Sequence, residues 1–118
     1  MIRTLKMQPV AQHHEMRGGQ GTTTVQQLFL PQEFGAQIRL CARLTLPPGA
    51  SIGEHQHIRE DEVYVIISGE ALLSDNGVET RIGPGAAVLT GDGGSHSIAN
   101  AGDEPLELLA FIISHAAP

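Results

Sequence analysis

The sequence has no tryptophan, one cysteine and only seven basic residues among 118. A single cysteine, Cys41, excludes an internal disulfide framework. With few basic residues and a formal net charge of −6, no nucleic-acid partner is expected. No apolar run reaches membrane-spanning length and the N-terminus has no secretory pattern, so no membrane partner is expected either. The default location is therefore the cytoplasm.

Aromatic side chains are also scarce, with three phenylalanines and one tyrosine. Valine, isoleucine and leucine must therefore fill the core of what its length predicts to be a single domain. Fourteen glycines and seven prolines in so short a chain indicate many tight turns, and hence many short strands.

Several segments alternate between apolar and polar residues, and none has a sustained helical period. The clearest alternation covers residues 37–46, and Asn76-Gly77 is a strong hairpin signal because a primed turn needs positive φ at both positions. The predicted strands are residues 24–30, 37–46, 62–67, 70–74, 78–82, 87–90, 95–99 and 106–113. This pattern predicts an all-β sandwich or barrel.

The spacing of His55, His57 and Glu62 indicates a metal site. Two imidazoles two residues apart on an extended chain point to the same face. Glu62 lies five positions after His57, so a turn or bulge within residues 58–61 is needed to bring its carboxylate to the same side. Two neutral imidazoles and one carboxylate are suitable ligands for a divalent transition metal.

Two segments resemble the paired signature of the cupin superfamily, over roughly residues 40–111. The first has a glycine, five residues, His-x-His, four residues, Glu, six residues and Gly, at Gly49, His55, His57, Glu62 and Gly69. The second has Gly85, Gly93, His96 and Asn100, with Gly91 where the family usually has proline. The resemblance implies a single-domain antiparallel jelly-roll β-barrel with His55, His57, Glu62 and His96 as metal ligands.

On this interpretation residues 1–23 form an N-terminal arm, residues 24–113 the barrel and residues 114–118 a tail. By resemblance to single-barrel cupins, a homodimer is expected, in which the arm could serve as an exchanged strand. His13, His14 and His115 are interpreted as ordinary surface or core residues.

If the ligands face the interior, strand alternation predicts which other side chains do. The expected pocket lining is Leu40, Ala42, Leu44, Ile66, Ile98, Leu108, Ala110 and Ile112, with Tyr64. This largely apolar cavity suits a small, mostly apolar molecule that offers oxygen to the metal. Tyr64 is the one acid/base candidate besides the ligands, although a packed tyrosine with a satisfied hydroxyl is an equal alternative.

The opposite face of the 37–46 strand carries Arg39, Cys41 and Arg43, and it is expected to face outward. If it faced inward, the two arginines would instead clamp a carboxylate. Cys41 is interpreted as a passive thiol, and Glu54 and Glu60 are expected in solvent at the barrel mouth.

Two functions remain open from the sequence. The first is a metal-dependent enzyme of a cupin type, such as a dioxygenase, decarboxylase, lyase, isomerase or cyclase, and it is the favoured hypothesis. The second is a non-catalytic module that binds or senses a small molecule. By resemblance, manganese or iron is the first expectation for the ion, and mixed nitrogen and oxygen ligands are also compatible with zinc, nickel or cobalt.

Overall fold

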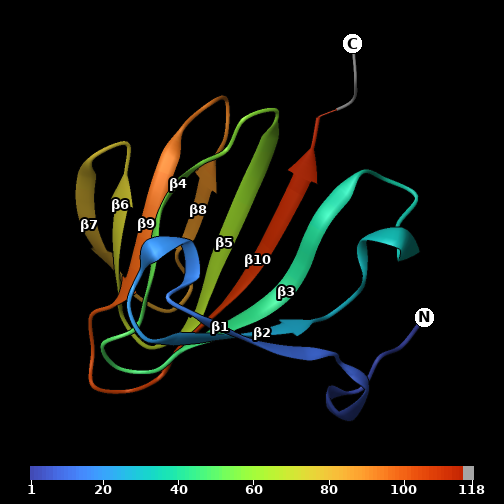
Figure 1. The fold of residues 1–118 in the computed structure, drawn as a ribbon, viewed down its shortest axis with the longest axis horizontal. Helices are drawn as coiled ribbons and strands as arrows, with labels where there is room; N and C mark the ends of the chain where they lie inside the picture. Colours follow the sequence, from blue (N-terminus) through green and yellow to red (C-terminus); the bar gives the residue numbers. More distant parts are fainter. Residues whose placement is uncertain (116–118) are drawn as a thin grey trace.

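The computed structural model describes residues 1–115, which form two antiparallel sheets packed face to face (Figure 1). The strands are β1 (Val10–His14), β2 (Thr22–Gln27), β3 (Ile38–Leu46), β4 (Ser51–Gln56), β5 (Glu60–Ser68), β6 (Ala71–Asp75), β7 (Val78–Ile82), β8 (Ala87–Thr90), β9 (Ser95–Asn100) and β10 (Leu106–Ser114). One sheet has the order β1-β2-β3-β10-β5-β8 and the other β4-β9-β6-β7. Three short 3₁₀ turns complete the described elements: η1 (Leu5–Met7), η2 (Met16–Gly18) and η3 (Pro31–Glu33).

The predicted all-β antiparallel fold is confirmed. At the predicted hairpin, Asn76 and Gly77 have φ of 49° and 85°, as a primed two-residue turn requires. No bounds were predicted for β1, which lies in the predicted N-terminal arm, or for β4, although His55 and His57 were expected on an extended chain. No helix among residues 1–115 is long and apolar enough to cross a membrane.

The core lies between the two sheets and consists almost entirely of aliphatic side chains. Strand alternation directs Leu44 and Leu46 of β3 and Leu106 and Leu108 of β10 into it, each at most 1% exposed. Burying a leucine side chain of this kind stabilises the fold by roughly 1.5–3 kcal/mol. The aliphatic layer therefore supports the polar site described below.

Two β-bulges change the direction of side chains that matter for the site. In β4, Ile52 is opposite Ile98 and His55 is opposite His96, so two residues of β4 face a single residue of β9. In β3, Ile112 is opposite Leu40 and Ile113 is opposite Ile38, which leaves Arg39 as the extra residue. A bulge redirects side chains that a regular strand would place on the other face.

The N-terminal segment is more than a polar arm. β1 pairs with β2 of the same chain, and this hairpin lies across one end of the barrel (Figure 1). Arg3 pairs with Glu33 through two hydrogen bonds of 2.6 and 2.9 Å. At the other end, Ser114 belongs to β10, and residues 116–118 of the predicted tail lie outside the described part.

Candidate metal centre

Four side chains from separate parts of the chain meet inside the barrel. His55 comes from β4, His57 follows that strand, Glu62 comes from β5 and His96 from β9. The Nε2 atom of His96 lies 2.9 Å from that of His55, 3.0 Å from that of His57 and 2.8 Å from Oε1 of Glu62. One ligand atom from each residue lies within 4.8 Å of all the others. The group has the composition and spacing to hold a metal ion.

A tight turn brings Glu62 to the two histidines. The chain leaves β4 at Gln56, reverses through Arg59 with φ of 60°, and enters β5 at Glu60. This left-handed residue provides the change of phase that the five-residue spacing between His57 and Glu62 requires.

The Nδ1 atom of each imidazole faces away from the centre and has an oxygen partner. His55 contacts the Gly53 carbonyl at 2.8 Å, His57 contacts Glu60 at 2.8 Å, and His96 contacts the Thr90 hydroxyl at 2.9 Å. A carbonyl and an ionised carboxylate only accept hydrogen bonds, so Nδ1 of His55 and of His57 carries the proton. A hydroxyl can donate or accept, and that of Thr90 accepts from Nδ1 of His96 when Nε2 of the same ring is a metal ligand.

These outward hydrogen bonds leave the Nε2 lone pairs directed at one another and at a carboxylate. Acceptors facing each other at about 3 Å repel unless a cation lies between them. The donor set therefore fits a divalent ion bound where the four side chains converge.

Glu62 is ionised although only 3% of it is exposed. Burial would raise the pKa of its carboxyl group, but the contacts with His55, His96 and His57 outweigh burial and lower it to about 2. A metal ion at the same place would favour the carboxylate for the same electrostatic reason.

Tyr64 packs flat against His96, with ring centroids 4.8 Å apart and 8° between the ring planes. Burial, and then the charge and hydrogen bond of Glu62, raise the pKa of the phenol well above its ordinary value. The hydroxyl therefore stays protonated and serves as a hydrogen-bond donor at neutral pH. The stacked ring of Tyr64 also restricts the rotation of the His96 ring.

A cavity of about 180 Å³ opens beside the four donors. Its lining combines three of the donors with apolar, basic and amide side chains. The residues are His13, Met16, Arg17, Val25, Gln27, Arg39, Leu40, Leu44, Ile52, His55, His57, Glu62, Tyr64 and Ile112. Sites for drug-sized ligands measure roughly 300–1,000 Å³, so this cavity suits a smaller molecule.

The expected lining residues divide between the cavity and the core. Leu40, Leu44 and Ile112 line the cavity, as does Tyr64. The structure places Ala42, Ile66, Ile98, Leu108 and Ala110 in the packed cluster between the sheets, outside the cavity lining. Alternation identifies the inward face of a strand but not how far along it the cavity extends.

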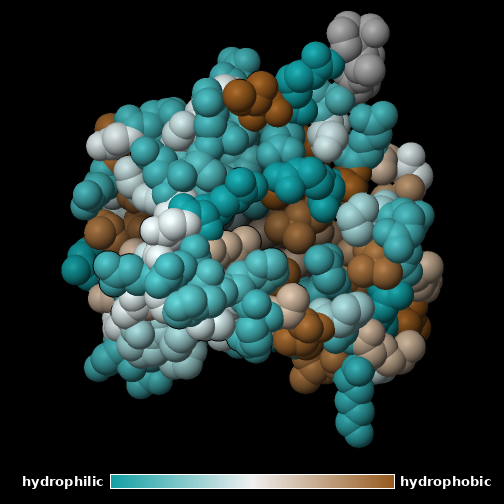
Figure 2. All heavy atoms as spheres, viewed as in Figure 1, coloured by the Kyte–Doolittle hydropathy of each residue, from teal (hydrophilic) through white to brown (hydrophobic). Residues whose placement is uncertain are grey.

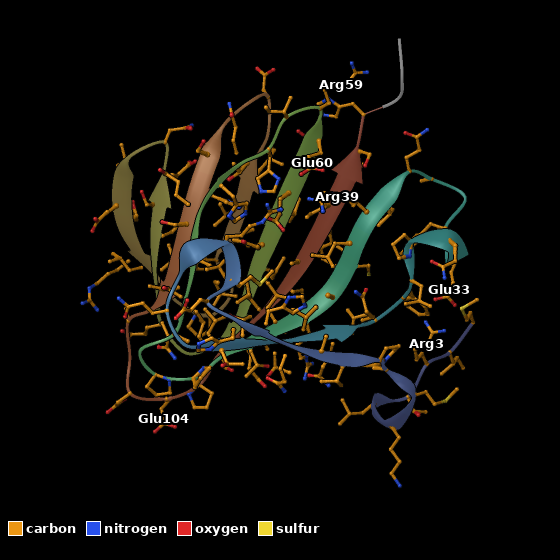
Figure 3. The ribbon with its side chains drawn as sticks, viewed as in Figure 1. Arg3, Glu33, Arg39, Arg59, Glu60 and Glu104 are labelled. Carbon is orange, nitrogen blue, oxygen red and sulfur yellow. The ribbon has the colours of Figure 1, made fainter. Side chains whose placement is uncertain are left out.

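Arg39 was expected to face outward and Glu60 to lie in solvent at the barrel mouth, but both lie beside the donor group. Arg39 lines the cavity because the bulge in β3 redirects it. Its Nε and Nη2 atoms each donate to Glu60 at 2.8 Å, and the two side chains lie together in Figure 3. The same carboxylate accepts from His57, so Glu60 links the arginine to the donor group. Arg43 remains outside the cavity lining.

Sequence reasoning missed the contribution of the N-terminal hairpin to the site. His13, Met16 and Arg17 come from β1 and η2, and Val25 and Gln27 come from β2. The connection between β1 and β2 packs on β4, in front of β4 and β9 in the view of Figure 1. No motif marks these residues, because the glycines of the connection indicate a turn without indicating where it docks.

The chain belongs to the cupin family, since a family model described as "Cupin domain" matches residues 42–112. A Thermotoga maritima protein named "Oxalate-binding protein" is 44% identical over 98 residues, covering 83% of this chain and 81% of that protein. The Streptomyces glaucescens protein named "Tetracenomycin polyketide synthase protein TcmJ" is 31% identical over 114 residues, covering 97% and 72%.

Among solved structures, a predicted oxalate decarboxylase from Thermotoga maritima superimposes with a TM-score of 0.92 and 38% identity, covering 97% of this chain and 99% of that one. KdgF from Halomonas sp. has a TM-score of 0.74 at 16% identity, a likeness of fold alone.

Proposed function

We propose that this chain binds one divalent transition metal ion through His55, His57, Glu62 and His96 and holds a small carboxylate of the oxalate type on the ion. One observation carries the metal part of the proposal. Three imidazole nitrogens and a carboxylate oxygen converge while the three opposite nitrogens make hydrogen bonds away from the centre. A bound ion would act as a Lewis acid toward an oxygen ligand.

Four protein ligands leave positions for an exogenous ligand on a six-coordinate ion, unlike a closed structural site. Manganese or iron is the first choice, and the nitrogen and oxygen donors are also compatible with zinc, nickel or cobalt. Glu62 contributes the one negative charge of the protein ligand set, so a divalent ion keeps a net positive charge that favours an anionic ligand.

The basic side chains around the cavity also favour an anion. Arg17, Arg39 and His13 line it together with the aliphatic residues. This arrangement points to a small carboxylate rather than to the mostly apolar molecule expected from the sequence. Two of the similar proteins described above have oxalate in their names, and oxalate is small enough for the cavity.

Metal content and oxalate titration test the proposal. The purified protein should contain about one divalent ion per chain by elemental analysis, and the manganese-loaded protein should bind oxalate in a calorimetric titration. His57→Ala combined with His96→Ala should abolish both properties, while His14→Ala, at an exposed position, should change neither. Wild-type protein that takes up no ion after reconstitution would disprove the proposal.

Catalysis at the same site is the second candidate, and the protonated hydroxyl of Tyr64 in the cavity lining favours it. A decarboxylase would form one formate and one carbon dioxide from each oxalate monoanion. Carbon-13 NMR of labelled oxalate with manganese-loaded protein in air distinguishes the candidates. Product that depends on protein and metal, and that falls with Tyr64→Phe, supports an enzyme. Stoichiometric binding without product supports a binding module.

We also propose that the partner of this chain is a second copy of itself. The outward face of the larger sheet has an apolar row, because Val63 is opposite both Phe111 and Leu89. Leu89 is 69% exposed. Hydrophobic side chains also gather toward the lower right of Figure 2, on the side where Figure 1 places the N-terminal segment. Exposed apolar patches of this kind are typical of interfaces.

Light scattering tests the dimer. The wild-type protein should have twice the mass of one chain, and Leu89→Glu should reduce the mass toward that of a monomer. Glu79→Lys is a suitable control because Glu79 lies on the smaller sheet. A monomeric wild-type protein would contradict the proposal.

A further inference from the structure

The connection between β1 and β2 forms a cap over the cavity, defined here as residues 15–21. Two of its non-glycine residues, Glu15 and Arg17, have positive φ of 51° and 54°. Such a backbone conformation is disfavoured for L-residues and persists where the surrounding structure holds it. Hydrogen bonds close the turn internally, from Gly18 to the Glu15 carbonyl and from Glu15 to the Gly21 carbonyl, at 2.9 and 2.8 Å.

The cap is fixed on β4 by main-chain contacts. The Ser51 amide donates to the Gln20 carbonyl at 2.8 Å, and the Gln20 amide donates to the Ser51 hydroxyl at 2.9 Å. A methyl group at Gly19 would collide with the Ser51 carbonyl, and one at Gly53 would collide with the Arg17 carbonyl. Glycine at both positions therefore lets the two backbones touch.

Gly53 connects the cap to the metal centre. Its bare Cα lies against the Arg17 carbonyl, and its own carbonyl accepts the hydrogen bond from His55. The position of Arg17 is thus set by the same short segment that orients a metal ligand. The side chain of Arg17 lines the cavity together with His55 and Glu62.

Arg17 differs from the other arginine of the cavity in having no carboxylate partner. Among residues 1–115, ion pairs join Arg39 to Glu60 and Arg3 to Glu33, but none involves Arg17. An unpaired guanidinium at a cavity with a cation-binding centre is available to bind an anionic group of a ligand.

From this placement we propose that Arg17 is a specificity-determining residue that pairs with the second carboxylate of a metal-bound dicarboxylate. The inference rests on the proposed function, and it adds the reason why a dianion is preferred over a monoanion that forms a similar chelate. The metal would bind one oxygen of each oxalate carboxylate in a five-membered chelate, and Arg17 would contact the free oxygen of the carboxylate that glycolate lacks. Arg39, already paired with Glu60, has less capacity for this role.

The test compares two ligands on manganese-loaded protein by calorimetric titration. Oxalate has two carboxylates, whereas glycolate has one carboxylate and a hydroxyl group and forms a similar five-membered chelate. Arg17→Gln should weaken oxalate binding by about tenfold, as expected for loss of one charge-assisted hydrogen bond, and leave glycolate within about twofold. The affinity of the metal-free protein for Mn²⁺ should stay the same, which shows that the centre is intact.

Three further variants separate the position of Arg17 from its charge. Arg81→Gln removes the same charge from an exposed arginine of β7, on the smaller sheet, and it should change no affinity. Gly19→Ala keeps the charge but forces the cap off Ser51, so it should weaken oxalate binding as Arg17→Gln does. Gly83→Ala should have no effect, because a methyl group there meets nothing within 4 Å.

The possible results distinguish this inference from the proposed function. If the wild-type protein binds oxalate and Arg17→Gln binds it equally well, the inference is overturned and the metal-bound carboxylate stands. If Arg17→Gln loses glycolate as strongly as oxalate, Arg17 supports the pocket rather than the choice of ligand, and the inference is again overturned. If the manganese-loaded wild-type protein binds neither ligand, the proposed function fails and the inference fails with it.

Discussion

His57 and Glu60 are joined by a hydrogen bond of 2.8 Å between the imidazole Nδ1 and the carboxylate Oε1. Hydrogen bonds from Arg39, opposed by burial and assisted by His57, hold the pKa of Glu60 below its usual value, so the carboxylate is charged. A charged acceptor at Nδ1 fixes the ring orientation and makes Nε2 a stronger metal ligand. Glu60 is therefore a positioning residue for the metal centre.

Glu60→Ala should lower the affinity for Mn²⁺ by about 10- to 100-fold, because the ring of His57 loses the acceptor that fixes its orientation. Calorimetric titration of the metal-free protein measures the change. Glu79→Ala removes a carboxylate from an exposed position of β7 and should leave the affinity unaltered. Equal affinities in wild-type and Glu60→Ala proteins would show that the hydrogen bond has no effect on the metal.

Thr90 is a positioning residue for His96, because its hydroxyl contacts Nδ1 of that ring. The residue is only 3% exposed. Thr90→Val keeps the shape and removes the acceptor, so it leaves a buried N–H group unpaired. The free energy of unfolding of the metal-free protein should fall by about 1–3 kcal/mol. Denaturant titration measures it, and Thr80→Val on exposed β7 is the matched control. If Thr90→Val is as stable as the control, the hydrogen bond does not contribute.

The strand positions and the ligand motif were largely predictable because each depends on a local pattern. Residues 78–82 and 87–90 were predicted with the bounds that β7 and β8 have, since turn signals flank both. Asn76-Gly77 dictates its own hairpin geometry. The fixed spacing of the two histidine segments allowed the family to be recognised, and the cupin fold followed from it.

What the sequence did not reveal depends on contacts between distant segments. Arg39 lines the cavity because β3 has a bulge opposite Ile112 and Ile113, and alternation assumes a regular strand. Glu60 was expected in solvent because its partners, His57 and Arg39, lie on different segments. The docking of the cap on β4 depends on two glycines that meet backbone rather than on any periodicity. Tertiary packing decided all three.

A substitution in the core should lower the stability of the protein without changing the metal content of the site. Leu108 is fully buried between the sheets and does not line the cavity. Leu108→Ala should reduce the free energy of unfolding by about 2–5 kcal/mol, since it leaves a void among side chains that relax only partly. The metal content should stay at about one ion per chain, because Leu108 does not line the cavity beside the donors. Loss of metal from a variant that is still folded would contradict this separation.

The ion pair between Arg3 and Glu33 should make the attachment of the N-terminal segment depend on pH. Both residues lie far along the chain from the metal ligands. Hydrogen bonds from Arg3 and then from the Leu30 amide lower the pKa of its carboxyl group from the ordinary value of 4.5. A carboxyl group whose pKa is lower in the folded state contributes stability above its unfolded pKa and loses it as the pH falls through the folded pKa. Attachment of the N-terminus should therefore be complete at pH 7 and weaken only below pH 4.5.

The amide of Leu30 reports this change, because it donates to Glu33 at 2.6 Å. In an NMR titration its proton resonance should stay constant from pH 7 to about 4.5 and then shift with a midpoint below that value. Glu33→Gln should abolish the titration, while Glu79→Gln should preserve it. A midpoint at or above 4.5 in the wild-type protein would mean that Arg3 and Glu33 do not pair in solution.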